Sequence, residues 1–95
     1  MALMTSLDAE ARSRFAADHP EWALDREEIS RTVQLDGFPA AVAFVVQVAF
    51  LAEAADHHPD IDIRWNKVTL RLTTHSAGAL TSKDTALAEK ISALA

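Results

Sequence analysis

The chain has 95 residues, 49% apolar and 24% charged, which is the balance of an ordinary soluble globule, and we expect one domain over residues 1–95. A net charge of −5 argues against direct binding to nucleic acid or to an anionic membrane surface, and the lack of cysteine excludes a disulfide, a thiolate nucleophile and a sulfur metal site. The amino terminus has no basic segment followed by an apolar run, so we expect no secretory signal and a cytoplasmic protein.

The first quarter of the chain predicts a helix and a short strand. Apolar residues one turn apart indicate a helix over residues 7–17, with Thr5 or Ser6 as its cap. The His-Pro pair at 19–20 should end this helix, because the residue before a proline is disfavoured in helical conformation. A short strand, "WALD", is then expected to begin at Trp22.

The next part of the chain predicts a second strand and a long helix. The strand "ISRTVQLD", residues 29–36, alternates apolar and polar side chains. The helix should span Phe38 to Ala55, with Pro39 at its first position and Asp36 or Gly37 as its cap. We expect this helix to be a buried helix of a soluble protein, because it is shorter than the roughly 20 residues that a bilayer span needs.

This central helix has two apolar stripes rather than one. The first contains Val42, Val45, Val46 and Ala49, and the second contains Phe44, Val48 and Leu51. One sheet face can cover only one stripe. The other stripe should therefore contact another helix, either from this chain or from a second copy, and the sequence leaves both open.

Two further strands and a last helix complete the prediction. The strands, residues 61–65 and 68–72, should form a hairpin with Asn66–Lys67 as a two-residue turn. The last helix should run from Ser82 to Leu94, with Thr81 as cap and Asp84 as the capping-box residue. Strands in pairs predict an α+β fold in the order α-β-β-α-β-β-α, a four-stranded antiparallel sheet with three helices on one face.

The hairpin brings three of the four histidines to one end of the sheet. With Trp65 opposite Val68, the residue numbers of every pair along the ladder add up to the same total. Ile63 therefore faces Leu70, and Asp62 faces Arg71. Extending the same register places His58 near His75, although Pro59 disturbs that last step. His57 and Asp56 lie beside them at the end of the central helix.

These residues resemble the signature of the pterin-4a-carbinolamine dehydratases, and the resemblance covers about residues 20–94. The signature has an acidic residue, three spacers, His-His-Pro, an aromatic residue, a later histidine and a final aspartate. Here it is matched by Glu53, His57, His58, Pro59, Trp65, His75 and Asp84. Trp65 stands where tyrosine is common, and Trp22 stands where these proteins usually have a tryptophan.

The resemblance implies a hydro-lyase that removes water from a 4a-hydroxytetrahydropterin to give the quinonoid dihydropterin. It implies acid/base roles for His57 and His75, which suits imidazole because it titrates near pH 6.5. No metal or redox cofactor is needed to eliminate water. The residues expected to hold the substrate are His58, Glu53, Asp56 and Trp22. The resemblance also implies a homodimer or homotetramer.

Other interpretations of these residues remain open. Asp84 is expected to be a helix cap rather than a catalyst, and Trp65 a core or sheet-surface residue. The histidines and neighbouring aspartates have the ligand types of a metal site, although adjacent histidines on a regular element do not aim both rings at one ion. Some members of the family act as dimerisation cofactors for a transcription factor, and here the second stripe of the central helix is the feature that would serve such a role.

Overall fold

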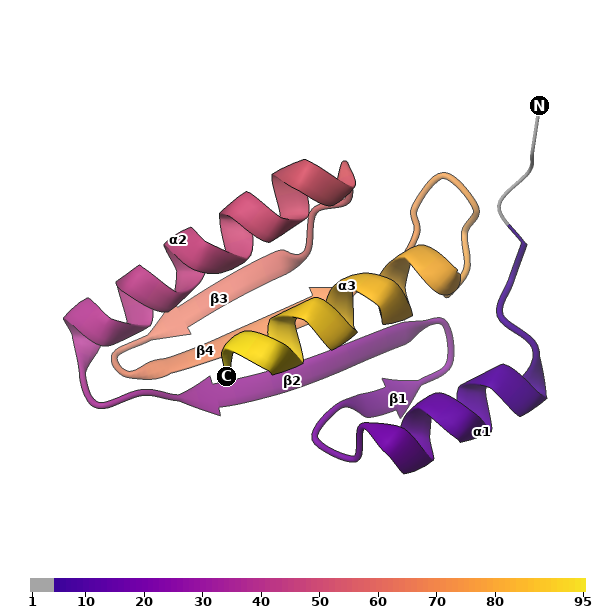
Figure 1. Cartoon of the computed structure of the whole chain (residues 1–95), viewed down its shortest axis with the longest axis horizontal. Helices are drawn as coiled ribbons and strands as arrows, with labels where there is room; N and C mark the ends of the chain where they lie inside the picture. The colour runs from indigo at the N-terminus through magenta and orange to yellow at the C-terminus, as the bar shows by residue number, and fades with distance from the viewer. Residues whose placement is uncertain (1–4) are drawn as a thin grey trace.

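The structure is a computed structural model that describes residues 5–95 (Figure 1). Its elements are α1 (Ala9–Asp18), β1 (Ala23–Asp25), β2 (Glu28–Gln34), α2 (Phe38–Ala55), β3 (Asp60–Arg64), β4 (Lys67–Leu72) and α3 (Ser82–Leu94). The strands form one antiparallel sheet in the order β1-β2-β4-β3. The predicted α+β fold and its order of elements are confirmed, with strand ends shifted by one or two residues. The expectation of no secretory signal rests partly on residues 1–4, which lie outside the described residues.

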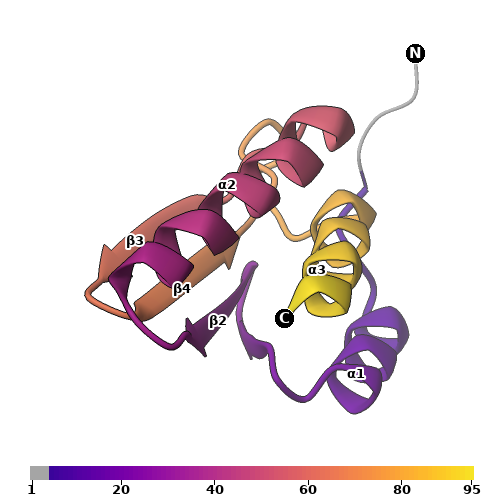
Figure 2. The same ribbon diagram turned by 60° about the vertical axis from the view of Figure 1, so that its left-hand side comes forward.

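The helices form a second layer, in which α3 lies between α2 and α1 (Figure 2). The helix-facing side of the two central strands is mostly apolar and buried at alternate positions, with Arg31 as the polar exception on β2, where it donates to Ser92 of α3. The buried apolar positions are Ile29 and Val33 on β2 and Val68, Leu70 and Leu72 on β4. They form one core with the inner faces of the helices.

Helix α1 begins two residues later than predicted, and its cap is Asp8 rather than a residue in 5–6. The N–H of Ala11, which a longer helix would give to the Leu7 carbonyl, is donated to the Asp8 carboxylate (2.8 Å). The Leu7 carbonyl accepts from Nε of Arg12 instead (2.6 Å). Side-chain hydrogen bonds therefore replace the first predicted helical turn. The helix ends at the His-Pro pair, as predicted.

Helix α2 has the predicted bounds, with Gly37 as its cap and Pro39 in its first turn. It is not the buried helix that the sequence predicted, because one side faces the core and the other faces solvent. The buried residues are Ala41, Phe44, Val48 and Ala52. Exposed positions at a spacing of four form what we call the outer stripe: Phe38 (54% exposed), Val42 (38%), Val46 (48%) and Phe50 (74%).

By length and composition alone, α2 would qualify to cross a membrane. In the folded chain, however, its inner side chains belong to the same core as the sheet. This half-covered helix therefore has an apolar surface that neither the sheet nor α3 covers.

The hairpin of β3 and β4 turns one residue earlier than predicted, so its register is shifted by two. Ile63 lies opposite Val68, and the two turn residues are Trp65 and Asn66 rather than Asn66 and Lys67. Asn66 fixes this turn, because its side-chain amide donates to the Leu35 carbonyl (2.9 Å) and its own carbonyl accepts from the Leu35 N–H (2.8 Å).

A shift of two residues leaves every side chain on its predicted face but changes its partner. Asp60 lies opposite Arg71, where Asp62 was predicted. Because β3 begins only at Asp60, His58 and His75 are not a ladder pair, and the predicted proximity of the two is confirmed by the pocket that both line. His58 lies just before β3 and His75 follows β4, so the two histidines lie near each other at the same end of the hairpin.

Candidate active site

A surface pocket of about 270 Å³ lies where α2 ends, β3 begins and β4 passes into the loop before α3. This volume is near the lower end of small-molecule sites, which start at about 300 Å³. The pocket contains the three histidines that the sequence grouped together. Its lining residues are Asp56, His57, His58, Thr73, Thr74, His75, Ser76 and Lys83.

The end of α2 sets the direction in which the first histidine leaves the helix. Asp56 adopts a left-handed conformation (φ 50°), which aspartate tolerates better than most residues. Its N–H returns to the Glu53 carbonyl (3.1 Å), and the N–H of His57 returns to the Ala52 carbonyl (3.0 Å). These bonds satisfy the last carbonyls of the helix and turn the chain toward α3.

His57 forms a hydrogen bond with a fully buried carboxylate. Its Nε2 lies 2.5 Å from Oδ1 of Asp84, with the two side chains 10% and 0% exposed. An ionised carboxylate accepts hydrogen bonds and donates none, so Nε2 is the donor. Nδ1 is then the nitrogen of His57 that remains for a molecule in the pocket.

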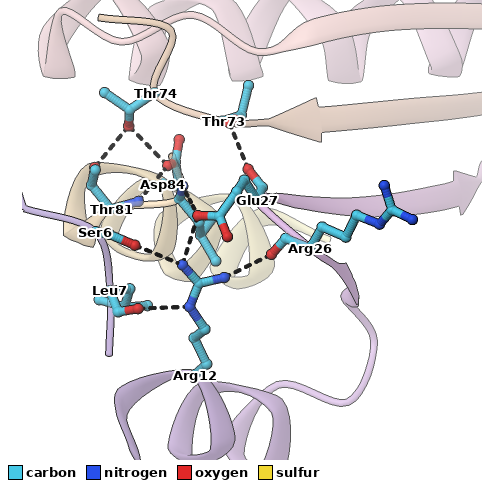
Figure 3. A network of polar contacts seen from close by, with 10 residues as sticks. Ser6, Leu7, Arg12, Arg26, Glu27, Thr73, Thr74, Thr81 and Asp84 are labelled. Atoms are coloured by element: carbon cyan, nitrogen blue, oxygen red, sulfur yellow. Dashed lines mark hydrogen bonds and ion pairs between the residues drawn. The ribbon is translucent and has the colours of Figure 1, made fainter. Parts of the chain in front are cut away.

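The second oxygen of Asp84 closes the capping box that the sequence predicted. Oδ2 accepts from the Thr81 N–H (2.9 Å) and from the Thr74 hydroxyl (2.8 Å) (Figure 3). Because the Thr74 proton is used for Asp84, the hydroxyl of Thr81 donates to Thr74 (2.7 Å). Asp84 is thus both the helix cap and the partner of His57. The expectation that it is a cap was right but incomplete.

His58 makes a different kind of contact. Its Nε2 lies 3.0 Å from Oε1 of Glu53, and the two side chains are 64% and 81% exposed. An ion pair this exposed contributes little to stability and leaves both groups free to rearrange. His58 and Glu53 therefore suit contact with a ligand better than a structural role.

His75 reaches the pocket from the loop that follows β4. The loop is closed by the Thr74 N–H, which donates to the Ala79 carbonyl (3.1 Å), and by the Gly78 N–H, which donates to the His75 carbonyl (3.1 Å). Gly78 has a φ of 62°, a conformation that costs glycine little. His75 itself is exposed, so its ring is accessible to a molecule in the pocket.

The two tryptophans singled out in the sequence lie elsewhere. Trp22 is buried (3% exposed), its indole N–H donates to the Ser92 hydroxyl (2.9 Å), and it does not line the pocket. The structure therefore does not support the expectation that Trp22 holds the substrate. Trp65 is 70% exposed at the turn between β3 and β4, at the end of the hairpin away from the pocket, so it is a surface residue.

Sequence reasoning missed four lining residues: Thr73, Thr74, Ser76 and Lys83. Three of them carry hydroxyls and surround His75 in the run "TTHS", which was the available signal. Lys83 adjoins Asp84, and its side chain supplies a cation that the histidine pattern did not suggest.

The two adjacent histidines do not direct their Nε2 atoms to one metal position. His57 and His58 each direct Nε2 to a different carboxylate. Within residues 5–95, no three His, Asp or Glu side chains form a group that could hold a metal ion.

The model of the family described as pterin 4 alpha carbinolamine dehydratase matches residues 5–94 of the chain. The chain belongs to the pterin 4 alpha carbinolamine dehydratase family. As a member of this dehydratase family it is an enzyme of the hydro-lyase class, as the sequence predicted.

Relatives of the chain include proteins provisionally named pterin-4-alpha-carbinolamine dehydratases. One, from Chloroflexus aurantiacus, is 65% identical over 75 residues, which are 79% of this chain and 81% of that protein. Another, from Roseiflexus sp. (strain RS-1), is 62% identical over 84 residues, which are 88% of this chain and 89% of the relative. The fold also matches a crystal structure of a transcriptional coactivator/pterin dehydratase from Brucella melitensis. That match has a TM-score of 0.89 and 32% identity, and it covers 96% of this chain and 99% of the other.

Proposed function

We propose that the chain dehydrates a 4a-hydroxytetrahydropterin to the quinonoid dihydropterin, with His57 and His75 as general acid and base. The observation that supports this most directly is the bond between His57 and Asp84 on the wall of a pocket that also holds His75. It places a titratable ring with one defined free nitrogen where a small heterocycle can bind.

The proposed chemistry needs one proton delivered and one removed. The C4a hydroxyl leaves as water only after it accepts a proton, while the lone pair of the neighbouring ring nitrogen forms the new C=N bond. That nitrogen then loses its own proton to a base. Imidazole can perform either transfer at neutral pH, and the hydrogen bond to the buried Asp84 carboxylate holds the His57 ring in one orientation and one tautomer.

The two histidines approach the pocket from different elements. His57 follows α2, and His75 lies on the loop after β4. We propose that each serves one epimer of the 4a-hydroxyl best, so that the pair is partly redundant. We propose that His58 and Asp56, which line the pocket, hold the amide and amino edge of the pterin together with Glu53, which does not line the pocket but bonds His58 in an exposed pair.

We further propose that the chain forms one domain that works as a homodimer or homotetramer through the outer stripe of α2. A single core of this small size gains stability from association. Helix α2 has four exposed apolar side chains, and its one charged residue, Glu53, lies near its end. This surface favours contact with the same stripe of a second copy of the chain. Recycling of a pterin cofactor in the cytoplasm is the setting that we propose for the reaction.

The test is a dehydration assay with the substrate generated in place by a pterin-dependent hydroxylase. Stopped-flow absorbance should show faster loss of the 4a-hydroxypterin than the spontaneous reaction. Prolonged chelation of protein purified without a histidine tag should leave this rate unchanged. Loss of activity that zinc restores would instead assign His57, His58 and His75 to a ligand set.

A further inference from the structure

Arg12, on α1, bonds several separate stretches of chain, although α1 does not supply any of the residues that line the pocket. Its side chain is 16% exposed. The guanidinium donates to the carbonyls of Leu7 (2.6 Å) and Arg26 (2.7 Å), the hydroxyl of Ser6 (3.0 Å) and the carboxylate of Glu27 (2.7 Å). A planar group with five donors in fixed directions can satisfy four acceptors at once, which a lysine cannot do.

Glu27 connects Arg12 to both ends of the loop that carries His75. Its Oε1, shared with Arg12, also accepts from the Leu80 N–H (3.1 Å). Its main-chain carbonyl accepts from the hydroxyl of Thr73 (2.6 Å). Residue 73 begins this loop and residue 80 ends it. Glu27 therefore holds the start of loop 73–80 through its main chain and the end through its side chain, and Arg12 bonds that side chain.

The next residues along the chain connect these contacts to the pocket, which Thr74 lines. Thr74 follows Thr73, Thr81 follows Leu80, and both threonines bond Asp84, the partner of His57 (Figure 3). Arg12 and Glu27 thus form an outer layer behind the residues that orient His57. Within the loop, His75, Ser76 and Gly78 are exposed, so few packing contacts hold them in place.

We propose that Arg12 and Glu27 are positioning residues of the active site, which set the place of His75 relative to His57 by holding both ends of loop 73–80. Neither lines the pocket, so neither is a catalytic residue. The kinetic part of this inference rests on the proposed dehydratase function. The structural part does not.

The size of the effect follows from the geometry. A reacting group misplaced by 1 Å can lower a rate by about 10²-fold. The closing bond between Thr74 and Ala79 does not involve Arg12, so we expect it to survive the substitution. We therefore expect a loss of about tenfold in kcat for the epimer that His75 serves, and a change in KM of less than about threefold. A purely stabilising role would lower the unfolding midpoint and leave both constants of the folded enzyme as they are.

The experiment compares Arg12→Lys, Glu27→Ala and the control Arg14→Lys. Arg12→Lys keeps the positive charge but loses the planar guanidinium and its fixed donors. Glu27→Ala removes the acceptor of the Leu80 N–H. The control makes the same chemical change on the same helix at a side chain that is 65% exposed and whose polar partner among residues 5–95 is Glu10. For each variant, kcat and KM are measured well below the unfolding midpoint, and the imidazole resonances of His75 are recorded by NMR.

Both test variants should shift the His75 resonances and lower kcat, and Arg14→Lys should do neither. A folded Arg12→Lys protein with unchanged His75 resonances and unchanged kcat would overturn the inference. If Arg12→Lys does not fold, Glu27→Ala decides by the same criteria. If the wild-type protein does not dehydrate the pterin, the proposed function fails, and the His75 resonances alone decide whether Arg12 and Glu27 position the loop.

Discussion

Replacing Asp84 tests the central contact of the site, because this carboxylate holds both α3 and His57. It is fully buried and accepts three hydrogen bonds, from His57, Thr74 and Thr81. Asp84→Ala would leave three buried donors without partners, at about 1–3 kcal/mol each. The total, about 3–9 kcal/mol, is comparable with the whole stability of a chain this size, about 5–14 kcal/mol. We expect that variant to unfold.

Asp84→Asn is the variant that separates stability from chemistry. Its one remaining oxygen can still accept from Thr81 and Thr74, so we expect a loss of only about 1–3 kcal/mol from weaker, uncharged bonds. The amide nitrogen then faces Nε2 of His57 and donates a hydrogen bond to it. Nε2 must therefore be the acceptor, and the ring proton of neutral His57 moves to Nδ1. The imidazolium form also loses its counter-charge. A tautomer error of this kind can cost up to about 10⁴-fold.

The expected kinetic result depends on the epimer. For the 4a-hydroxy epimer that His57 serves, Asp84→Asn should lower kcat by about 10²-fold or more, the typical effect of losing a general acid. The other epimer should lose less than about tenfold, because His75 is intact. Stopped-flow absorbance on each epimer measures this, and nitrogen-15 NMR reports the His57 tautomer. Glu89→Gln, which removes an exposed carboxylate from the same helix, is the control.

One result would refute this reasoning. If the His57 tautomer changes as expected in folded Asp84→Asn and both epimers still react at the wild-type rate, His57 does not act as an acid through Asp84.

Three further results are expected. Asp56→Asn keeps a residue that tolerates the left-handed conformation, so it should raise KM by about three- to tenfold with little change in kcat if Asp56 holds substrate; an unchanged KM would remove it from the site. Val46→Asp, in the outer stripe, should lower the mass found by light scattering across a dilution series, whereas the same change at buried Phe44 should unfold the chain; a wild-type monomer at high micromolar concentration would contradict the assembly proposal. The hydrogen bond from Arg12 lowers the pKa of Glu27 below its usual value of 4.5, so its contribution to stability is present above that pH and lost as the pH falls through the lower, folded-state value. Urea unfolding between pH 3 and 7 should therefore show a smaller acid loss for Glu27→Gln than for wild type, and identical curves would refute this.

Local patterns in the sequence were sufficient for the elements whose stabilising contacts are local. The bounds of α3 and its capping box follow from Thr81 and Asp84, which are three residues apart. The end of α1 follows from a His-Pro pair. The start of α1 was wrong because Leu7 donates its N–H to the distant Leu80 carbonyl, while the Arg12 side chain occupies its carbonyl.

Contacts between distant residues account for the other errors. The hairpin register depends on Asn66 bonding Leu35, which are 31 residues apart. The partner of His57 is 27 residues away, so local periodicity could indicate Asp84 only as a cap. The histidine cluster was nevertheless predicted correctly, because a two-residue slip moves no side chain to the other face. The sequence could not show that Trp22 is buried away from the pocket, because a motif records which residues recur but not where a ring points.

The most direct test of the central claim is the dehydration rate of the double variant His57→Ala with His75→Ala. Each single variant should lower kcat unequally for the two epimers, because each acid is partly replaced by the other. The double variant, shown by its unfolding curve to be folded, should dehydrate the 4a-hydroxypterin no faster than the spontaneous reaction. A folded double variant that keeps most of the wild-type rate would show that neither histidine is the acid.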